Sequence, residues 1–523
     1  MRPGPARVLA NVPVVSNQTP PPALRPRTVH PVRLADLFAQ AGPTQVSGIT
    51  HDSRLVGPGD LYVALPGRRH HGAEFAAQAA AAGAAAVLTD ADGARLGASL
   101  AVPVVVVDDP RREMATVAAA IFGRPGEAMT MYAVTGTAGK TTTTFLLDAA
   151  LRATGTRTGL VGTIGFFLDG RPLEATRTTV TTPESTELQA LLGYLHEQGA
   201  QAATMEVSSH ALSLGRVDAI PFAVSAFTNL GQDHLDFHHD EEAYFAAKAS
   251  LFTPDRTRHA VVNIDDPRGR LLAGLLAEAG ELELTTVSLT EAADCQALAC
   301  DLREDGRTGV RARLRERTVE FTLSLPGEFN VRNAVTALAM VAAAGGDLDA
   351  AARGLASAWV PGRMQLVDLG PQAPVVYVDF AHTPQAVAAA LRAAGPRRRI
   401  AVLGCGGDRD PEKRRPMGAA AAQHADLVLV TDDNPRSEDP VAIRAEVLAG
   451  ARTALSAGGR ASEVLDGGDR RSAIRQALQR ARPGEVVAIL GKGHELGQEV
   501  AGEVLPFSDP EVAAAEWAAL NSC

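Results

Sequence analysis

Aromatic residues, cysteines and long apolar runs are all scarce in this chain of 523 residues. Phe, Trp and Tyr make up only 4% of it, so small apolar residues such as Ala and Val must fill any core. The four cysteines lack the spacing of a metal site and are too few for a disulfide framework, which fits a reducing compartment. No apolar run approaches the roughly 18 residues of a membrane span. We therefore expect a cytoplasmic protein with no membrane insertion.

Positively charged residues are also fewer than negatively charged ones, with 50 Lys and Arg against 60 Asp and Glu. The formal net charge is -10 at pH 7 and no basic stripe stands out, so nucleic acid is not an expected partner. A hydrophobic fraction of 46% is typical of a globular protein, and the length suggests about three domains of roughly 150 residues. Residues 1–28 contain a short, interrupted apolar run followed by prolines, unlike a signal peptide. We interpret them as a disordered extension, or as the result of a start codon assigned too far upstream.

The chain does contain a glycine loop between a β-prone run and a helical pattern. This loop, V-T-G-T-A-G-K-T-T-T, spans residues 134–143. Gly136 and Gly139 would let backbone N–H groups face phosphate oxygens at a helix N-terminus. Lys140 could then reach the β- and γ-phosphates, and the hydroxyl of Thr141 could ligate Mg²⁺. The strict phosphate-loop pattern has a further upstream glycine that is absent here, and an ordinary glycine turn with a chance lysine is the alternative.

Strand and helix patterns alternate after this loop, which indicates a parallel sheet with helices on both faces. The carboxyl ends of such strands meet at one edge, where ligands bind. Two polar segments follow consecutive strands: E-V-S-S-H begins at Glu206, and T-N-L-G-Q-D-H-L-D begins at Thr228. A helix that carries Lys248 comes next. Residues 278–325 differ, because their alternating strands predict a small antiparallel excursion.

Two further α/β patterns flank the central one. Before it, short strands and Ala-rich helices form a small unit that ends near residues 122–126. After a second linker at residues 360–363, four strands each end in a polar, charged or glycine-rich segment. These segments are D-F-A-H-T-P, G-C-G-G-D-R-D, T-D-D-N-P-R and G-K-G-H-E. Four such strand ends together predict a second binding edge.

From about Thr50 to Asp509, these motifs occur in the order found in the Mur ligase family, which the chain resembles. The resemblance implies an α/β fold with three domains. A small α/β N-terminal domain at 29–125 would bind UDP, and a central parallel-sheet P-loop-type ATPase domain at 126–359 would bind ATP and Mg²⁺. A Rossmann-like C-terminal domain at 360–523 would bind an amino acid. The pattern is most similar to the members that add the third residue of the peptide.

The resemblance also implies a reaction. These ligases use ATP to activate the D-Glu carboxylate of UDP-MurNAc-L-Ala-D-Glu as an acyl phosphate, and the amine of a diamino acid then attacks it. The step belongs to peptidoglycan biosynthesis. The implied partners are these small molecules, the implied cofactor is Mg²⁺, and we expect a monomer.

Individual roles follow from the motifs by the same resemblance. The catalytic residues would be Lys140, Glu206, His234 and Lys248. The metal ligands would be Thr141, Glu206, His234 and Lys248, the last as a carbamate. The ATP contacts would be Gly136, Thr137, Ala138, Gly139, Lys140, Thr141, Thr142, Asn330, Arg363 and Asp379. The UDP-MurNAc-dipeptide contacts would be Ser53, Thr181, Thr182, Ser209 and Arg216. The diamino-acid contacts would be Arg409, Asn434, Arg436, Gly491 and Glu495.

The diamino acid itself is predicted from Arg436. A planar guanidinium suits the far carboxylate of meso-diaminopimelate, which lysine and ornithine lack. Glu495 would then take the far ammonium. Two alternatives remain: the ligase uses lysine or ornithine, or Arg436 only holds its loop by pairing with Glu438 or Asp439.

Some positions depart from the family pattern, and other functions compete. Ala138 stands where Asn is frequent, Leu214 replaces a usual Gln, and Phe380 replaces Tyr. Leu496 and Gly497 replace a usual Asp-Tyr pair. The nearest rival is a folylpolyglutamate synthase or another amide ligase of the superfamily. A rival of another class is a non-catalytic nucleotide-binding regulator or a motion-coupled ATPase, but the charged residues such a protein could lose are all present.

Overall fold

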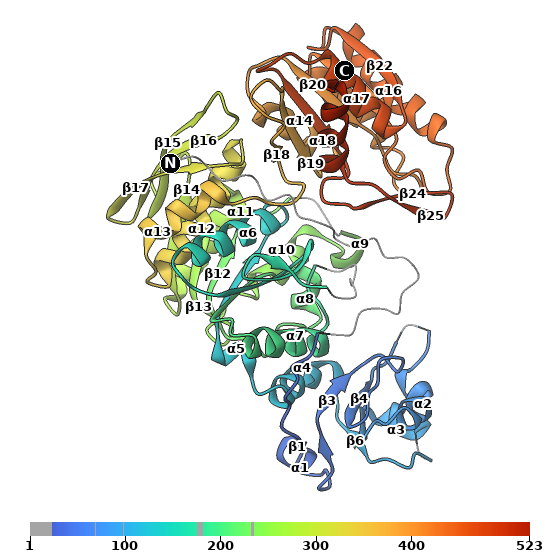
Figure 1. The fold of residues 1–523 in the computed structure, drawn as a ribbon. Coiled ribbons are helices and arrows are strands. Elements are labelled where there is room, and N and C mark those ends of the chain that lie inside the picture. The colour runs from blue at the N-terminus through green and yellow to red at the C-terminus, as the bar shows by residue number, and fades with distance from the viewer. Residues whose placement is uncertain (1–23, 68, 98, 175–180, 232–234, 523) are drawn as a thin grey trace. The chain divides into compact units, whose positions relative to one another are not determined.

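The computed structural model describes residues 24–522 except 68, 98, 175–180 and 232–234. The chain forms two compact units, which we describe separately. One runs from the start of the described chain to Leu366 and includes Arg392–Arg397. The other comprises Val367–Leu391 and the chain from Arg398 onward. Figure 1 shows the elements of both.

A four-stranded parallel sheet opens the first unit, with strand order β3-β4-β5-β6. Its strands are β3 (Gly48–Thr50), β4 (Asp60–Ala64), β5 (Ala86–Thr89) and β6 (Val104–Val106). Its helices are η1 (Gly72–Phe75), α2 (Ala76–Ala81), α3 (Ala91–Leu96) and α4 (Pro110–Ile121). Before the sheet lie β1 (Val32–Arg33), the short helix α1 (Leu34–Leu37) and β2 (Gln45–Val46). The small α/β unit is therefore present as predicted.

Residues 24–28, which the sequence assigns to a disordered extension, are part of the fold. Arg25 Nη1 donates to a carboxylate oxygen of Asp60 at 3.1 Å. The amides of Arg27 and Thr28 each donate to Glu197 at 3.0 Å. The interpretation of these five residues as disordered is wrong, and most of the predicted extension lies outside the described residues.

An eleven-stranded mixed sheet forms the centre of the first unit, in the order β10-β9-β8-β11-β7-β12-β13-β14-β15-β16-β17. The pairs from β8 to β15 are parallel, and the strands beyond them at both ends are antiparallel. The predicted antiparallel excursion is confirmed, but it continues the central sheet because β15 pairs with β14. The strands are β7 (Thr130–Thr135), β8 (Thr158–Gly162), β9 (Gly165–Leu168), β10 (Arg171–Pro172), β11 (Ala202–Glu206), β12 (Phe222–Phe227), β13 (Thr257–Asn263), β14 (Glu283–Ser288), β15 (Cys295–Leu302), β16 (Thr308–Leu314) and β17 (Arg317–Leu323).

Helices supply the apolar side chains that bury this sheet, and they form two separate hydrophobic cores with it. The helices are α5 (Pro125–Ala128), α6 (Lys140–Ala153), α7 (Ser185–Glu197), α8 (Ser209–Ser213), α9 (Leu235–His238), α10 (Glu241–Ala249), α11 (Pro267–Ala279), α12 (Glu328–Ala343), α13 (Leu348–Gly354) and η2 (Leu355–Ser357).

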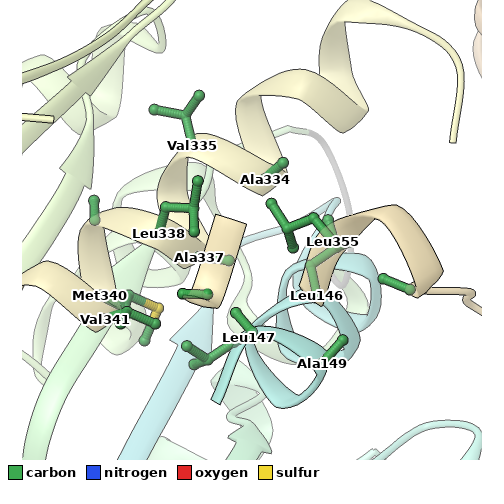
Figure 2. Close-up of a cluster of buried hydrophobic side chains, with 14 of the residues drawn as sticks. Leu146, Leu147, Ala149, Ala334, Val335, Ala337, Leu338, Met340, Val341 and Leu355 are labelled. Carbon is green, nitrogen blue, oxygen red and sulfur yellow. The ribbon is translucent and has the colours of Figure 1, made fainter. Parts of the chain in front are cut away.

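The helix that follows the glycine loop, α6, packs against α12 and α13. Figure 2 shows Leu146 and Leu147 of α6 gathered with Ala337 and Leu338 of α12 and with Leu355 of η2. These contacts are made mostly by Leu and Ala, as the scarcity of aromatic residues predicts. Because small side chains allow helices to approach closely, the position of the glycine loop depends on this packing.

The second unit contains a six-stranded sheet in the order β18-β19-β23-β20-β21-β22, parallel from β19 to β22. Its strands are β18 (Gln365–Val367), β19 (Val375–Asp379), β20 (Arg399–Leu403), β21 (Leu427–Thr431), β22 (Glu463–Gly468) and β23 (Val486–Leu490), with a separate hairpin of β24 (Gly497–Val500) and β25 (Glu503–Pro506). Its helices are α14 (Pro384–Ala393), α15 (Arg414–His424), α16 (Pro440–Ser456), α17 (Arg470–Arg480) and α18 (Asp509–Leu520). This is the Rossmann-like pattern that the sequence predicts. None of the described helices in either unit combines the length and hydropathy of a membrane span.

We predict that Leu338→Ala destabilises the protein by about 2–5 kcal/mol, because Leu338 is 0% exposed and its removal leaves a cavity between α12 and α6. Thermal unfolding of the ligand-free protein measures this change. Leu275→Ala is the matched control, since Leu275 lies on helix α11 and is 50% exposed. Equal melting temperatures for the two variants would contradict the role assigned to this core.

Candidate active site

The glycine loop after β7 has the backbone that a phosphate site requires. Gly136 and Gly139 have φ of +141° and +89°, which residues with a Cβ atom rarely adopt. A Cβ on Gly139 would lie 2.7 Å from Oδ1 of Asn333, which shows how closely α12 approaches the loop. Lys140 Nζ donates to the carbonyls of Gly136 and Thr137 at 2.8 and 2.9 Å. The loop is therefore curled around the ammonium group of Lys140.

The segment after β12 holds this loop in place. Asn229 donates to and accepts from the backbone of Ala138, with both distances at 2.9 Å. Thr228 Oγ1 donates to the same carbonyl of Ala138 at 2.7 Å. Asn263, which is buried at the end of β13, donates to the carbonyl of Thr228 at 2.6 Å. The sequence places T-N-L at a strand end, but it does not show that these residues support the glycine loop.

Glu206 ends β11 beside the loop and is 0% exposed. One carboxylate oxygen accepts from Thr141 Oγ1 at 2.9 Å and from Thr163 Oγ1 at 3.0 Å. The other accepts from the amide of Thr163 at 2.8 Å. Two predicted metal ligands, Thr141 and Glu206, are thus in direct contact, and hard oxygen donors at the N-terminus of α6 fit Mg²⁺. The sequence analysis did not select Thr163. The one feature of the sequence that points to this residue is its position just after a predicted strand.

Lys248, the predicted carbamate site, is 1% exposed. Its Nζ donates to the carbonyl of Gly136 at 2.9 Å and lies 4.4 Å from the centre of the Tyr244 ring. The structure therefore brings Lys248 to the glycine loop from a helix more than a hundred residues away. His234, its predicted partner at the second metal site, lies outside the described residues, and the described His, Cys, Asp and Glu residues form no metal-binding group of three or more.

Three of the predicted substrate contacts, Thr181, Thr182 and Arg216, are connected to Glu206 through hydrogen bonds. Thr182 Oγ1 donates to the carbonyl of Glu206 at 2.9 Å, and the hydroxyl oxygens of Thr163 and Thr181 lie 3.1 Å apart. Arg216 Nη1 donates to the carbonyl of Thr182 at 2.9 Å. The Nε atom of Arg216 is buried and has no acceptor among the described residues, which leaves a donor for a ligand.

The fourth contact, Ser209, pairs with a histidine that the sequence reasoning did not select. Nε2 of His238 lies 2.9 Å from Oγ of Ser209, and the ring of His238 is buried. The sequence feature that points to His238 is its position four residues after His234 in the same motif. Ser53, the fifth predicted contact, lies in a turn of the first unit; the neighbouring His51 reaches Thr186 of α7 at 3.2 Å.

Another predicted nucleotide contact, Asn330, lies outside the glycine loop on α12. Asn330 donates to the carbonyl of Pro326 at 2.8 Å, and its Oδ1 is buried without a partner among the described residues. Such an atom suits an amino group of a ligand. Asn333 approaches Gly139, as described above, although only Asn330 was selected from the sequence. Arg363 and Asp379 stay predictions as ATP contacts.

The loops after β21 and β23 meet in the second unit. Asn434 Nδ2 donates to Glu495 at 2.8 Å, and Lys492 Nζ donates to both Asn434 and Glu495 at 2.9 Å. Burial alone would raise the pKa of Glu495, but the Lys492 charge and these hydrogen bonds outweigh it and lower the pKa. Burial raises the pKa of Asp433. Oδ2 of the same residue would clash with any Cβ on Gly491. Gly491 thus has a steric reason to be glycine.

Arg436 has a different partner from those that the sequence suggested. Its Nε donates to Glu499 at 3.0 Å and its Nη1 donates to the carbonyl of Gly407 at 2.7 Å. Glu438 pairs instead with Arg414, and Asp439 caps α16. The alternative in which Arg436 pairs with either of these two acids is wrong. The predicted contact Arg409 is exposed on the neighbouring loop after β20.

Three family models match consecutive parts of the chain. They are described as the Mur ligase family catalytic domain at residues 45–122, the Mur ligase middle domain at 134–341 and the Mur ligase glutamate ligase domain at 362–493. Together they span the glycine loop, Glu206, Lys248 and the loop that contains Arg436.

Curated relatives are similar over nearly the whole chain. The UDP-N-acetylmuramoyl-L-alanyl-D-glutamate--2,6-diaminopimelate ligase of Streptomyces avermitilis is 47% identical, with 93% of this chain and 96% of that one covered. The same-named protein of Corynebacterium glutamicum is 44% identical, with 92% and 94% covered. The UDP-N-acetylmuramyl-tripeptide synthetase of Leifsonia xyli is 43% identical, with 93% and 96% covered.

Solved structures agree with these similarities. A UDP-N-acetylmuramoyl-L-alanyl-D-glutamate--2,6-diaminopimelate ligase is 31% identical with a TM-score of 0.70, covering 94% of this chain and 99% of that one. A Mycobacterium tuberculosis folylpolyglutamate synthase complexed with ADP has 20% identity and a TM-score of 0.56, covering 73% and 92%. The second likeness shows a shared fold alone.

We predict that Thr163→Val lowers kcat about tenfold and raises the Mg²⁺ concentration needed for half-maximal activity, because one carboxylate oxygen of Glu206 loses a hydroxyl donor. A Mg²⁺ titration of phosphate release measures both changes. Thr143→Val is the matched control, since the buried Oγ1 of Thr143 has no partner among the described residues and its loss should be nearly neutral. The role of Thr163 is refuted if both variants respond to Mg²⁺ as the wild type does.

Proposed function

Because this chain belongs to the Mur ligase family and is therefore a ligase, we propose that it joins meso-2,6-diaminopimelate to the D-Glu of UDP-N-acetylmuramoyl-L-alanyl-D-glutamate. ATP would convert the D-Glu carboxylate into an acyl phosphate, and the amine of the diamino acid would displace the phosphate. The product belongs to peptidoglycan biosynthesis. The observation that carries this proposal is the similarity, over more than nine-tenths of the chain, to relatives named for this reaction.

The central domain supports the ATP half of the reaction. The glycine loop and the N-terminus of α6 present N–H groups to phosphate oxygens, and Lys140 can exchange its two loop carbonyls for the β- and γ-phosphates. Thr141 and Glu206 would hold Mg²⁺, which neutralises phosphate charge during transfer. The chain's own contribution is therefore mainly charge neutralisation and positioning.

If Lys248 carries a carbamate, it supports a second metal site. Lys140 and Lys248 donate to the same carbonyl oxygen, so the two ammonium groups lie within about 6 Å and repel each other. Addition of CO₂ to the neutral amine forms an N–C bond, releases one proton and leaves an anion. An anion at this position would attract Lys140 and provide oxygen for a hard cation. His234 is its proposed partner.

The substrate residues support binding of the acceptor peptide beside the phosphate site. Arg216 offers its buried Nε to an anionic group, while Thr181 and Thr182 are connected to Glu206 and Ser209 pairs with His238. The UDP end would reach the first domain at Ser53. Asn330 would contact the nucleotide base through its buried Oδ1. These assignments rest on their positions in the family motifs as well as on the geometry.

The choice of diamino acid follows from the second unit. Asn434, Arg436 and Glu495 lie in adjacent loops, so an acid and a cation are available for the two charged groups at the far end of diaminopimelate. Lysine and ornithine are the alternative substrates, and the name of the Leifsonia xyli relative, a UDP-N-acetylmuramyl-tripeptide synthetase, specifies no amino acid. A folylpolyglutamate synthase activity has only the shared fold in its favour.

We predict that phosphate release requires ATP, the UDP-MurNAc-dipeptide and meso-diaminopimelate together. The kcat/KM for lysine and for ornithine should be at least tenfold below that for meso-diaminopimelate. Arg436→Lys should lower the preference for diaminopimelate, since an ammonium cannot form a planar fork. Arg460→Lys, in which an exposed arginine outside the site is changed, is the control. Preference for lysine or ornithine by the wild type would overturn the substrate assignment and leave the ligase assignment intact.

We predict that Lys248→Ala loses nearly all activity and regains part of it with a short carboxylic acid, which would replace the missing anion. Removal of dissolved CO₂ and bicarbonate should lower wild-type activity reversibly. Mass spectrometry or ¹³C NMR with labelled bicarbonate tests for the carbamate itself. A fully active enzyme without CO₂, and no labelled adduct, would exclude the modification.

A further inference from the structure

The β24–β25 hairpin is attached to the loop that contains Arg436. The amide of Arg436 donates to the carbonyl of Glu499 at 3.0 Å, and the amide of Ala501 donates to the carbonyl of Arg436 at 2.8 Å. Arg436 has a φ of +53°, a left-handed conformation that is uncommon for a residue with a long side chain. The hairpin therefore fixes both the place and the backbone conformation of this arginine.

Two more hydrogen bonds connect the same hairpin to the residues before Arg436. Gln498 Nε2 donates to the carbonyl of Asp433 at 2.7 Å, and the amide of Glu499 donates to Oδ1 of Asn434 at 3.0 Å. Three of the four positions of the D-N-P-R motif, Asp433, Asn434 and Arg436, are thus bound by one short segment. This segment directly follows Leu496 and Gly497, where the sequence departs from the family pattern.

The side chain of Glu499 determines which part of the guanidinium remains available. It accepts from Nε of Arg436 at 3.0 Å, and the carbonyl of Gly407 accepts from Nη1 at 2.7 Å. Nη2 has no acceptor in the part of the chain that the structure describes. With two of its three nitrogens engaged on the protein side, the guanidinium cannot rotate without breaking a charge-assisted hydrogen bond.

We propose that Glu499 is a positioning residue that determines the preference for a diamino acid with a far carboxylate. It holds the guanidinium by Nε, with Gly407 at Nη1, so that Nη2 is left for that carboxylate. This proposal rests on the proposed function, since it assumes that Arg436 binds the diamino acid. Lysine carries no far carboxylate, so its weaker use does not depend on the orientation of Arg436.

The charge balance is consistent with this role. Glu499 is 41% exposed at its side chain, so water solvates the carboxylate and limits its repulsion of a substrate anion. The pair formed by Arg436 and Glu499 is neutral overall, as is the ammonium and carboxylate end of diaminopimelate. The hairpin thus orients the guanidinium and offsets its formal charge with that of Glu499.

The test compares Glu499→Ala and Glu499→Gln in the wild-type and Arg436→Lys backgrounds, with meso-diaminopimelate and lysine as substrates. Glu499→Ala should raise the KM for diaminopimelate about tenfold, with kcat, the KM for ATP and the rate with lysine nearly unchanged. Glu499→Gln keeps an acceptor for Nε and should retain most of the preference. In the Arg436→Lys background, Glu499→Ala should have little further effect, because the two side chains act through one interaction.

Glu503→Ala is the matched control, since Glu503 is an exposed acid on the other strand of the same hairpin. If Glu499 had a merely structural role, Glu499→Ala would lower kcat/KM equally for diaminopimelate and lysine, and its effect would add fully to that of Arg436→Lys. That result would overturn the proposal. The proposal would also be overturned if the wild type ligates diaminopimelate and Glu499→Ala keeps the full preference for diaminopimelate over lysine. The proposed function would then stay intact. A wild-type enzyme that does not use diaminopimelate would overturn the proposed function first.

Discussion

The carbonyl of Gly136 accepts hydrogen bonds from two lysine side chains, and the arrangement of the central site depends on this oxygen. Lys140 reaches it from the first turn of α6 and Lys248 reaches it from α10. A Cβ on Gly136 would clash with Thr228, so no other residue permits this approach. The glycine loop, α6, α10 and the segment after β12 therefore converge on a single peptide group.

The sheets explain why distant residues converge. The strands around the loop are parallel neighbours, so their carboxyl ends lie at one edge and bring Glu206 and Thr228 to Thr141 and Ala138. The same principle acts in the second unit, where the ends of β20, β21 and β23 gather Gly407, Asn434 and Glu495. Strand order thus positions side chains that are separated by scores of residues, and loop hydrogen bonds complete the geometry.

Much of this could be predicted from the sequence. Strand–helix alternation predicted the α/β class. The family resemblance assigned Thr141 and Glu206 to one Mg²⁺ site; the structure shows that the two side chains are in contact, and the metal site stays a prediction. Helix α4 was not predicted, although Asp109 and Pro110 form a clear N-terminal signal. The contacts of Thr163 and Glu499 could not be predicted, because each depends on a loop conformation rather than on spacing. Residues 24–28 were misassigned because their bonds to Asp60 and Glu197 depend on tertiary structure.

The hydrogen bonds of Lys140 have a consequence for the thermodynamics of nucleotide binding. Its Nζ donates to the carbonyls of Gly136 and Thr137 in its own loop. A phosphate that draws Lys140 away from these carbonyls replaces one hydrogen bond with another, and such an exchange contributes only about 1 kcal/mol net per hydrogen bond. Most of the affinity must then come from the attraction between charges, which dissolved salt screens. Adenosine, which has no phosphate, would gain almost nothing from this loop, and the discrimination between nucleosides and nucleotides would weaken as ionic strength rises.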